Sequence, residues 1–463
     1  MKQFFKMMFA SAFGAFLALM LIGIIFVISL VGIIAGVSAE STASYSPKPR
    51  ESIFKISLEN VMYDSVEDNP FAIITGDDKA LSLRDILTSI QKAKEQNAIK
   101  GIYLDVGLFS AGTSSLDAIR RALIDFKESG KFVVAYADRY TQGGYYLASA
   151  ADKVYLNPLG VVALTGLASQ TTFRKGLLEK AGIEMMVFKV GTYKGAVEPY
   201  LGDKLSDANR AQITSYQSHI WKNIINGIAE SRHIPASDVN RFADEGLYFA
   251  DPSEAVKHGL IDELMYRSDV EKYLMEQAGQ TGKRMKTLTV DKVNRIKKVT
   301  REYHNKIAVL YAEGEITESI SSSPFSTQNC ITEKMANELI KLKDNEDVKA
   351  VVIRVNSPGG SAYVSDQIWK QVTELKKSKP VVVSMGNVAA SGGYYISCAA
   401  NKIVAEKNTL TGSIGIFGIF PNVSGLFQKL ALTTEVVKTN KYADLGDYSR
   451  PMNDDEKALI QGY

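Results

Sequence analysis

The sequence predicts an α/β protein of two similar domains that follow one N-terminal membrane helix. Three observations lead to this fold class. An uncharged apolar run opens the chain, short β-branched runs alternate with helical patterns, and one half of the chain repeats in the other at a constant spacing of 249 residues. The length of 463 residues suits two or three domains.

The opening segment is an uncharged run over residues 7–39, which is 33 residues long. A bilayer core needs about 20 apolar residues, whereas the apolar region of a signal peptide has about 7 to 15. We therefore expect residues 1–40 to form a cytoplasmic N-terminus and a retained transmembrane anchor, since Lys2 and Lys6 precede the run. The alternative is processing after the cleavage-like Val37-Ser38-Ala39.

The rest of the chain is a duplication. A shift of 249 positions places Gly143-Gly144-Tyr145-Tyr146 on Gly392-Gly393-Tyr394-Tyr395, and the match continues without gaps for about 110 residues. Repeats of this length indicate two similar domains rather than a solenoid. The predicted division is a tether rich in Ser and Pro, an N-terminal α/β domain, a basic connector and a C-terminal α/β domain, at residues 41–51, 52–282, 283–305 and 306–463.

Each half alternates strand and helix. The runs 101–106 and 350–355 are β-branched and too short for helices, and 132–136 and 381–384 give each half a second buried strand. Repeated βα units with apolar strands imply a mostly parallel sheet covered by helices. The connector has one helical stretch, which we expect to be solvated; contact with anionic lipid is the alternative.

The halves differ in length. The first half continues past Glu198 for about 65 residues, with helical patterns over 206–231 and 237–265. The second half ends at Tyr463, within the counterpart of the first of these helices. We therefore expect the second domain to be truncated and the sequence to be a fragment of a longer chain.

A serine stands at the start of a predicted helix in the second half. The strand 381–384 leads into Gly386-Asn387-Val388-Ala389-Ala390-Ser391-Gly392-Gly393, a turn of small residues followed by an apolar helix. The helix field favours negative charge on or beside the hydroxyl of Ser391, as a nucleophile needs. The first half has Gln142 at this place, which has no nucleophilic oxygen. The alternative role of Ser391 is that of an N-cap.

A glycine pair follows another predicted strand, in Asn356-Ser357-Pro358-Gly359-Gly360-Ser361. Gly359 and Gly360 would let backbone N–H groups approach a ligand closely, as an oxyanion hole requires. The alternative is a plain Pro-Gly turn. The first half has Gly107-Leu108-Phe109-Ser110-Ala111-Gly112 here, so the glycine pair and the serine are lost together in the same half.

The third difference is a lysine, because Lys194 of the first half falls on Ala443. A serine nucleophile needs a base, no histidine has an evident place near these turns, and an uncharged lysine could serve. Free lysine titrates near pH ~10.4, so this role requires burial and no carboxylate partner. Glu198 would oppose this lowering of the Lys194 pKa if its carboxylate turned inward, towards the amine. The alternative for Lys194 is a surface lysine in a loop.

Four motifs in order resemble signal peptide peptidase A, or protease IV, in its long duplicated form. The resemblance runs from the anchor to the last residue and rests on residues 193–199, 356–361, 389–394 and 411–415. It implies a crotonase/Clp-like fold in each half and a bowl-shaped oligomer, a tetramer in the long form. By motif match it implies Ser391 as nucleophile, Lys194 as general base, Ser413 as a residue that holds the lysine, and the backbone at Gly359 and Gly360 as oxyanion hole.

The same resemblance implies a single-pass protein of the bacterial inner membrane that degrades signal-peptide remnants on the periplasmic side. The anchor would hold the domains near the lipid bilayer, and an extended apolar peptide can pair with a strand edge. The expected partners are therefore signal-peptide remnants and other apolar peptides, the bilayer, and further copies of the chain in a homotetramer.

Two other functions compete with that of a membrane-anchored Ser/Lys endopeptidase. A non-catalytic membrane-anchored scaffold or quality-control adaptor would not need Ser391, Lys194 or the glycine pair, and the sequence has all of them. An enzyme resembling acyl-CoA hydratases would need coenzyme A and the carboxylates of that superfold, which are not evident.

Composition excludes further classes. The 54 basic and 51 acidic residues give a net charge of +3, which argues against a nucleic-acid binder. Cys330 and Cys398 cannot build a disulfide framework, and four histidines leave little room for a multi-histidine metal site. We expect neither a metal nor an organic cofactor.

Overall fold

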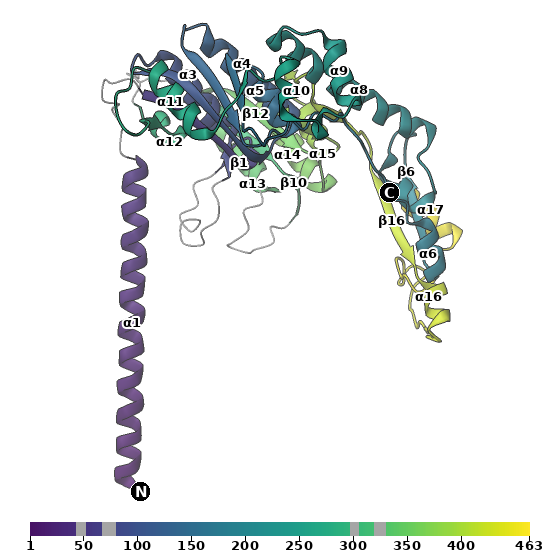
Figure 1. The fold of residues 1–463 in the computed structure, drawn as a ribbon. Helices are drawn as coiled ribbons and strands as arrows, with labels where there is room; N and C mark the ends of the chain where they lie inside the picture. The colour runs from purple at the N-terminus through teal and green to yellow at the C-terminus, as the bar shows by residue number, and fades with distance from the viewer. Residues whose placement is uncertain (43–51, 67–79, 297–304, 319–329) are drawn as a thin grey trace.

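The computed structural model describes residues 1–42, 52–66, 80–296, 305–318 and 330–463. The first helix, α1 (Lys2–Thr42), extends away from the rest of the protein (Figure 1). Its window Gln3–Phe26 is long and apolar enough to cross a membrane, and none of that window is buried inside the protein. Most of the predicted tether, residues 43–51, lies outside the described residues.

The first domain is built on one parallel sheet with the strand order β2-β1-β3-β4-β5-β7, and β8 pairs with β1. These strands carry the predicted β-branched runs in their centres, so the core residues of β3 and β4 are buried on both faces. The bounds are β1 Ser52–Tyr63, β2 Leu81–Ser82, β3 Ile99–Ser110, β4 Phe132–Ala137, β5 Lys153–Leu156, β7 Glu263–Leu264 and β8 Thr287–Leu288.

The longer helices of this domain bury one apolar face against the sheet, as α3 shows. In α3 (Leu83–Glu95) the buried Ile86, Ile90 and Ala93 recur at helical spacing, and the Ser82 hydroxyl caps the helix by accepting from the Asp85 amide. The remaining helices are α4 Thr113–Lys127, α5 Gln142–Ala148, α9 Ala236–Asp244, η2 Leu247–Phe249, α10 Pro252–Lys257, α11 Arg267–Gln277 and α12 Val290–Asn294.

The second domain repeats this plan. Its parallel sheet has the order β14-β13-β12-β9, and β15 pairs with β13. The strand order confirms the repeat, because β1-β3-β4-β5 of the first sheet corresponds to β9-β12-β13-β14 of the second, and Val106 of β3 and Val355 of β12 lie 249 positions apart. The bounds are β9 Lys306–Glu313, β10 Glu315–Ile316, β11 Cys330–Ile331, α13 Lys334–Asp344, β12 Val348–Ser357, α14 Ala362–Leu375, β13 Val381–Ala390, α15 Gly392–Cys398, β14 Lys402–Val404 and β15 Leu410–Gly412.

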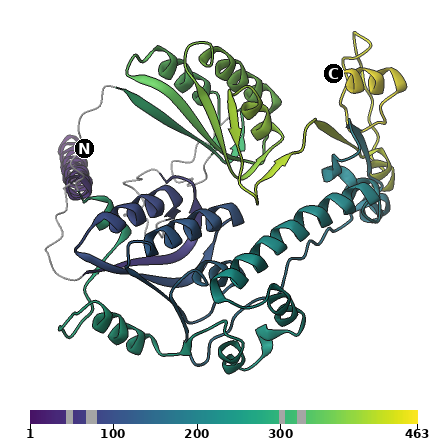
Figure 2. The same cartoon turned by 90° about the horizontal axis from the view of Figure 1, so that it is seen from above.

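An arm projects from the two domains, and the long helix α8 (Asp207–Arg232) reaches towards it (Figure 2). At its centre β6 (Glu184–Lys189) of the first half pairs antiparallel with β16 (Phe417–Asn422) of the second. The arm therefore joins the halves through a strand pair that neither half forms alone. Its helices are α6 Lys175–Ala181, α16 Ser424–Lys429 and α17 Asp454–Gly462, and η1 Gly195–Val197 and α7 Glu198–Leu201 lead back to α8.

Two sequence predictions need correction. The expectation of a solvated connector helix is wrong for α12, because Val293 and Ile296 are buried against the first domain and β8 extends its sheet. The described part of the connector, 283–296, thus completes the first domain, and residues 297–304 lie outside the described residues. The predicted strand 381–384 continues as β13 to Ala390, because its small residues pair with β15.

Candidate active site

Ser391 occupies a sharp turn between β13 and α15. Its φ of 52° and ψ of −118° lie in a region that residues with a Cβ rarely adopt, which costs about 1–3 kcal/mol. Its hydroxyl makes no capping hydrogen bond, so the N-cap role does not account for this serine. Its amide donates to the Gly412 carbonyl at 2.9 Å. The backbone is thus held in a strained conformation that leaves the hydroxyl available.

Ser413 lies beside Ser391 because of the strand pairing. Ala390, the last residue of β13, pairs with Gly412, the last residue of β15. The residues that follow these two are therefore neighbours. Ser413 also has a positive φ, of 49°, so both serines leave their strands through strained turns.

Lys194 comes from the first half and reaches these serines through the arm. The pairing of β6 with β16 sets Lys189 opposite Phe417. Lys194 follows Lys189 by five residues, and Ser413 precedes Phe417 by four. The antiparallel register therefore brings Lys194 and Ser413 to the same end of the strand pair.

The Lys194 amine contacts three oxygens. Its Nζ lies 2.6 Å from the Ser413 carbonyl oxygen, 3.1 Å from Ser413 Oγ and 3.4 Å from Ser391 Oγ. A neutral amine has two N–H donors and one lone pair. The two oxygens of Ser413 can accept the two N–H bonds, which leaves the lone pair for the Ser391 hydroxyl proton. This geometry suits an amine that accepts a proton from Ser391.

The surroundings of Lys194 favour the neutral form. Lys194 is 7% exposed, and this burial lowers the pKa of its amine below the ordinary value. Glu198, which could have opposed the effect, is turned to Ser206 and Asn209: its carboxylate accepts from the Ser206 hydroxyl at 2.5 Å and from Asn209 Nδ2 at 3.0 Å. Burial alone would raise the pKa of Glu198, but these hydrogen bonds outweigh it and lower the pKa.

The glycine pair lies against Ser391. Gly359 and Gly360 have φ angles of 100° and 149°, which favour glycine. The Gly359 amide donates to Ser357 Oγ at 3.1 Å, whereas the Gly360 amide has no hydrogen-bond acceptor among the described residues. Gly360 is therefore the better donor for a substrate oxygen. Gly392 adds a second amide at the start of α15, because Gly359 packs against its nitrogen; the sequence analysis did not single out this group.

We predict that Gly359→Ala disables the site. A Cβ at Gly359 would lie 2.6 Å from the Gly392 nitrogen and 2.8 Å from Ser391 Cβ, so the turn that holds the serine must shift. A displacement of about 1 Å costs about 100-fold in rate, and we expect this loss in kcat of peptide hydrolysis. The control is Gly176→Ala in α6, where a Cβ meets nothing within 4 Å. Equal activity of both variants would contradict the prediction.

The first domain has no equivalent site. The side chain of Gln142 is bound to the backbone: its Oε1 accepts from the Thr165 and Gly166 amides at 3.1 and 2.9 Å, and its Nε2 donates to the Gly166 carbonyl. The strand β3 continues to Ser110 across the place of the glycine loop. One chain thus brings together one serine, one lysine and one glycine loop. In the part of the chain that the structure describes, no cluster of three or more His, Cys, Asp or Glu residues could hold a metal ion.

The fold and the site together define a Clp-like α/β protein, and comparisons with known proteins agree. The sequence profile of Clp protease matches residues 314–409, which carry the glycine loop and Ser391. The profile of peptidase family S49 matches residues 125–281 and 373–463, together more than half of the chain. The chain belongs to peptidase family S49.

The chain is also similar to curated proteins that are named as proteases. Protease 4 of Haemophilus influenzae is 37% identical over 403 residues, which cover 83% of this chain and 65% of the relative. Protease 4 of Salmonella typhi is 37% identical, covering 79% of this chain and 60% of the relative. The chloroplastic serine protease SPPA of Arabidopsis thaliana is 34% identical, covering 82% and 57%. The chain thus spans about three fifths of the length of these relatives.

Proposed function

We propose that the chain is a serine endopeptidase with a Ser/Lys dyad, in which Ser391 is the nucleophile and Lys194 the general base. The observation that carries this proposal is the contact of a buried amine, whose hydrogen-bond partners among the described residues are serine oxygens, with the hydroxyl of a strained serine, at 3.4 Å. The family membership supports the same reaction class.

The reaction follows from these positions. Neutral Lys194 takes the proton of the Ser391 hydroxyl while Oγ attacks the carbonyl carbon of the peptide bond. The Gly360 and Gly392 amides donate to the oxyanion that forms. The lysine ammonium, held by Ser413, then gives its proton to the leaving amine as the C–N bond breaks. A water molecule then loses a proton to Lys194 and attacks the acyl carbon. The lysine ammonium returns that proton to Ser391 Oγ as the acyl C–O bond breaks, which releases the second product and the free serine.

The proposed substrates are signal-peptide remnants and other apolar peptides at a membrane surface. The helix α1, with its apolar window Gln3–Phe26, would anchor the protein in the bilayer, and the proposed location is the bacterial inner membrane with the domains on the periplasmic side. A cleaved signal peptide is apolar and is released into that membrane, so the anchored site would meet it at a high local concentration.

A repeat within the arm supports assembly into a ring of copies, for which we propose a homotetramer. The offset of 249 makes residues 433–438 the counterpart of β6 and residues 168–173 the counterpart of β16. In one described chain neither segment lies in a strand, and Val437 is 95% exposed. Residues 433–438 of one copy would therefore pair with residues 168–173 of the next, as β6 pairs with β16 within the chain.

The assembly is tested by the mass of the detergent-solubilised protein. Proline removes a ladder N–H, so Val436→Pro and Val437→Pro should reduce the mass from four chains towards one. Monomeric wild type, or tetramers in both variants, would contradict the proposed pairing.

The peptidase proposal is tested with two fluorogenic peptides of equal length, one derived from an apolar signal-peptide sequence and one with alternating charges. The solubilised full chain should cleave the apolar peptide at least about tenfold faster in kcat/KM. A scaffold or adaptor predicts cleavage of neither. Equal cleavage of both peptides would retain the peptidase but contradict the substrate class.

A further inference from the structure

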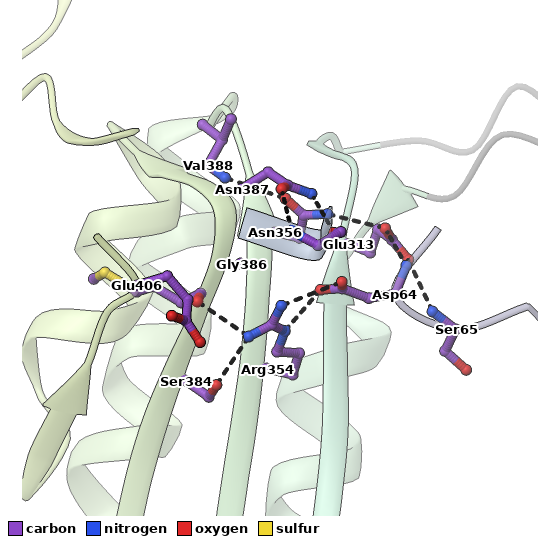
Figure 3. Close-up of polar contacts among 12 residues, drawn as sticks. Asp64, Ser65, Glu313, Arg354, Asn356, Ser384, Gly386, Asn387, Val388 and Glu406 are labelled. Carbon is purple, nitrogen blue, oxygen red and sulfur yellow. Dashed lines mark hydrogen bonds and ion pairs between the residues drawn. The ribbon is translucent and has the colours of Figure 1, made fainter. Parts of the chain in front are cut away.

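A largely buried ion pair, Asp64 with Arg354, joins the two domains (Figure 3). Asp64 follows β1 of the first domain, and Arg354 lies on β12 of the second. The guanidinium donates to the Asp64 carboxylate with Nε at 2.8 Å and Nη2 at 3.3 Å. The side chains are 1% and 16% exposed. A charged pair buried this deeply is a weak source of stability, because desolvation offsets its attraction, so its geometry suggests another purpose.

Arg354 also fixes the two strands that carry the site. Its Nη1 donates to Ser384 Oγ at 3.0 Å and to the Met385 carbonyl at 3.1 Å, both on β13. Strand β12 leads into the glycine loop, and β13 leads into Ser391. One guanidinium therefore ties the oxyanion-hole strand and the nucleophile strand to the first domain (Figure 3).

A second carboxylate completes the connection. Glu313, at the end of β9, accepts from the Asp64 amide at 2.8 Å and from Asn356 Nδ2 at 3.1 Å. The Asn356 side chain in turn accepts from the Val388 amide at 3.2 Å, on β13. Burial and the neighbouring Asp64 raise the pKa of Glu313, while the backbone N–H groups of Asp64 and Ser65 oppose the rise. The network is continuous from the first domain to both strands that form the site.

We propose that Asp64, Arg354 and Glu313 are positioning residues that hold the two domains in the register at which Lys194 meets Ser391. The inference rests on the proposed function. It follows from the composite site: the base comes from the first half and the nucleophile from the second, so a small slip between the domains separates them. By contrast, the surface pair of Arg121 and Glu406 across the same boundary has side chains that are 57% and 30% exposed, and such pairs hold geometry weakly.

The test uses Asp64→Asn and Arg354→Lys in the solubilised full chain. Asp64→Asn removes the charge, and a lysine at 354 cannot reach both strands and Asp64 at once. We expect kcat for the apolar peptide to fall about 10- to 100-fold with KM within about twofold. A looser contact between the domains also admits water to Lys194. The pH at which activity rises should therefore move up, towards the ordinary pKa of lysine. A variant that merely lost folded protein would keep the wild-type pH profile.

The matched control is Glu59→Gln. The strand registers make Glu59 the first-domain counterpart of Glu313, but its side chain is exposed, so activity and pH profile should stay at wild-type values. Thermal unfolding checks each variant; if Asp64→Asn does not fold, Arg354→Lys decides. Wild-type kcat in the folded variants, or a reduced kcat with an unchanged pH profile, would overturn the positioning role.

A second readout separates this inference from the proposed function. The pH dependence of Lys194 acetylation, followed by mass spectrometry, reports the ionisation of the amine without any peptide substrate. In Asp64→Asn its midpoint should move up, towards that of exposed lysines in the same chain. If wild type cleaves no peptide but the midpoint moves, the positioning role stands and the peptidase proposal fails. An unmoved midpoint overturns the positioning role.

Discussion

Ser391→Ala should reduce kcat for apolar peptides by at least about 10⁴-fold, the effect expected when the nucleophile of a serine peptidase is removed. The reason is chemical, because alanine removes the Oγ that lies 3.4 Å from Lys194 Nζ on the turn that packs against Gly359. The substitution is small, and alanine removes an oxygen that makes no capping hydrogen bond. The folded state and the assembly should therefore persist, and steady-state kinetics on the purified variant measures the loss.

The matched control is Gln142→Ala, at the equivalent position of the first domain. Among the described residues, the Gln142 side chain hydrogen-bonds to the backbone of Thr165 and Gly166 in its own domain. This variant should therefore keep activity within about threefold, the range expected for a substitution away from the chemistry. Residual activity of Ser391→Ala above about 1% of wild type would exclude Ser391 as the nucleophile.

Lys194→Met should reduce kcat by about 10³- to 10⁴-fold, at the upper end of what a general base contributes. Methionine fills the same buried space without an amine. The direction of the pH dependence follows from the role of the base. Lys194 works as the neutral amine, so wild-type activity is lost as the pH falls through the folded-state pKa of Lys194. Because burial lowers that pKa, activity should appear at a lower pH than ordinary lysine, near ~10.4, would allow.

The same variant should not lose stability. A lysine whose pKa is lower in the folded state than in the unfolded state opposes folding at pH values below the unfolded pKa, and the opposition weakens as the pH rises. Lys194→Met removes this effect, so thermal unfolding at pH 7 should occur at the wild-type temperature or higher. Lys189→Met, on β6 and five residues away, is the control for activity. A Lys194→Met variant that is inactive but also strongly destabilised would point to a structural lysine instead.

Disagreement between the repeats was the signal that made the site predictable. Gln142 against Ser391 and Ala443 against Lys194 mark positions where one copy retains a chemical group that the other has lost. The parallel sheets were predictable for a similar reason, since the β-branched runs recur at the same spacing in both halves. A group that occurs once, with no counterpart to compare, gives no such signal.

The contact between Asp64 and Arg354 is made by two such groups, which have no matching pair in the other repeat. Asp64 and Arg354 are 290 positions apart, and no periodicity or repeat relates them. The continuation of β13 to Ala390 was also missed, because its small residues form a strand through pairing with β12 and with β15, a three-residue partner. The buried face of α12 was hidden by the basic residues around it. In each case tertiary pairing decides the structure, and local composition does not reveal it.

The most direct test of the composite site is to identify the residue that a serine-reactive fluorophosphonate phosphonylates, with loss of fluoride, and to follow the rate as a function of pH. We predict one adduct, on Ser391, at a rate that rises with pH to a plateau below the ordinary pKa of lysine. Lys194→Met should suppress this reaction although its serine is unchanged. Modification of a different residue, or modification of Ser391 at the same rate in Lys194→Met, would contradict a site in which the first half activates the serine of the second.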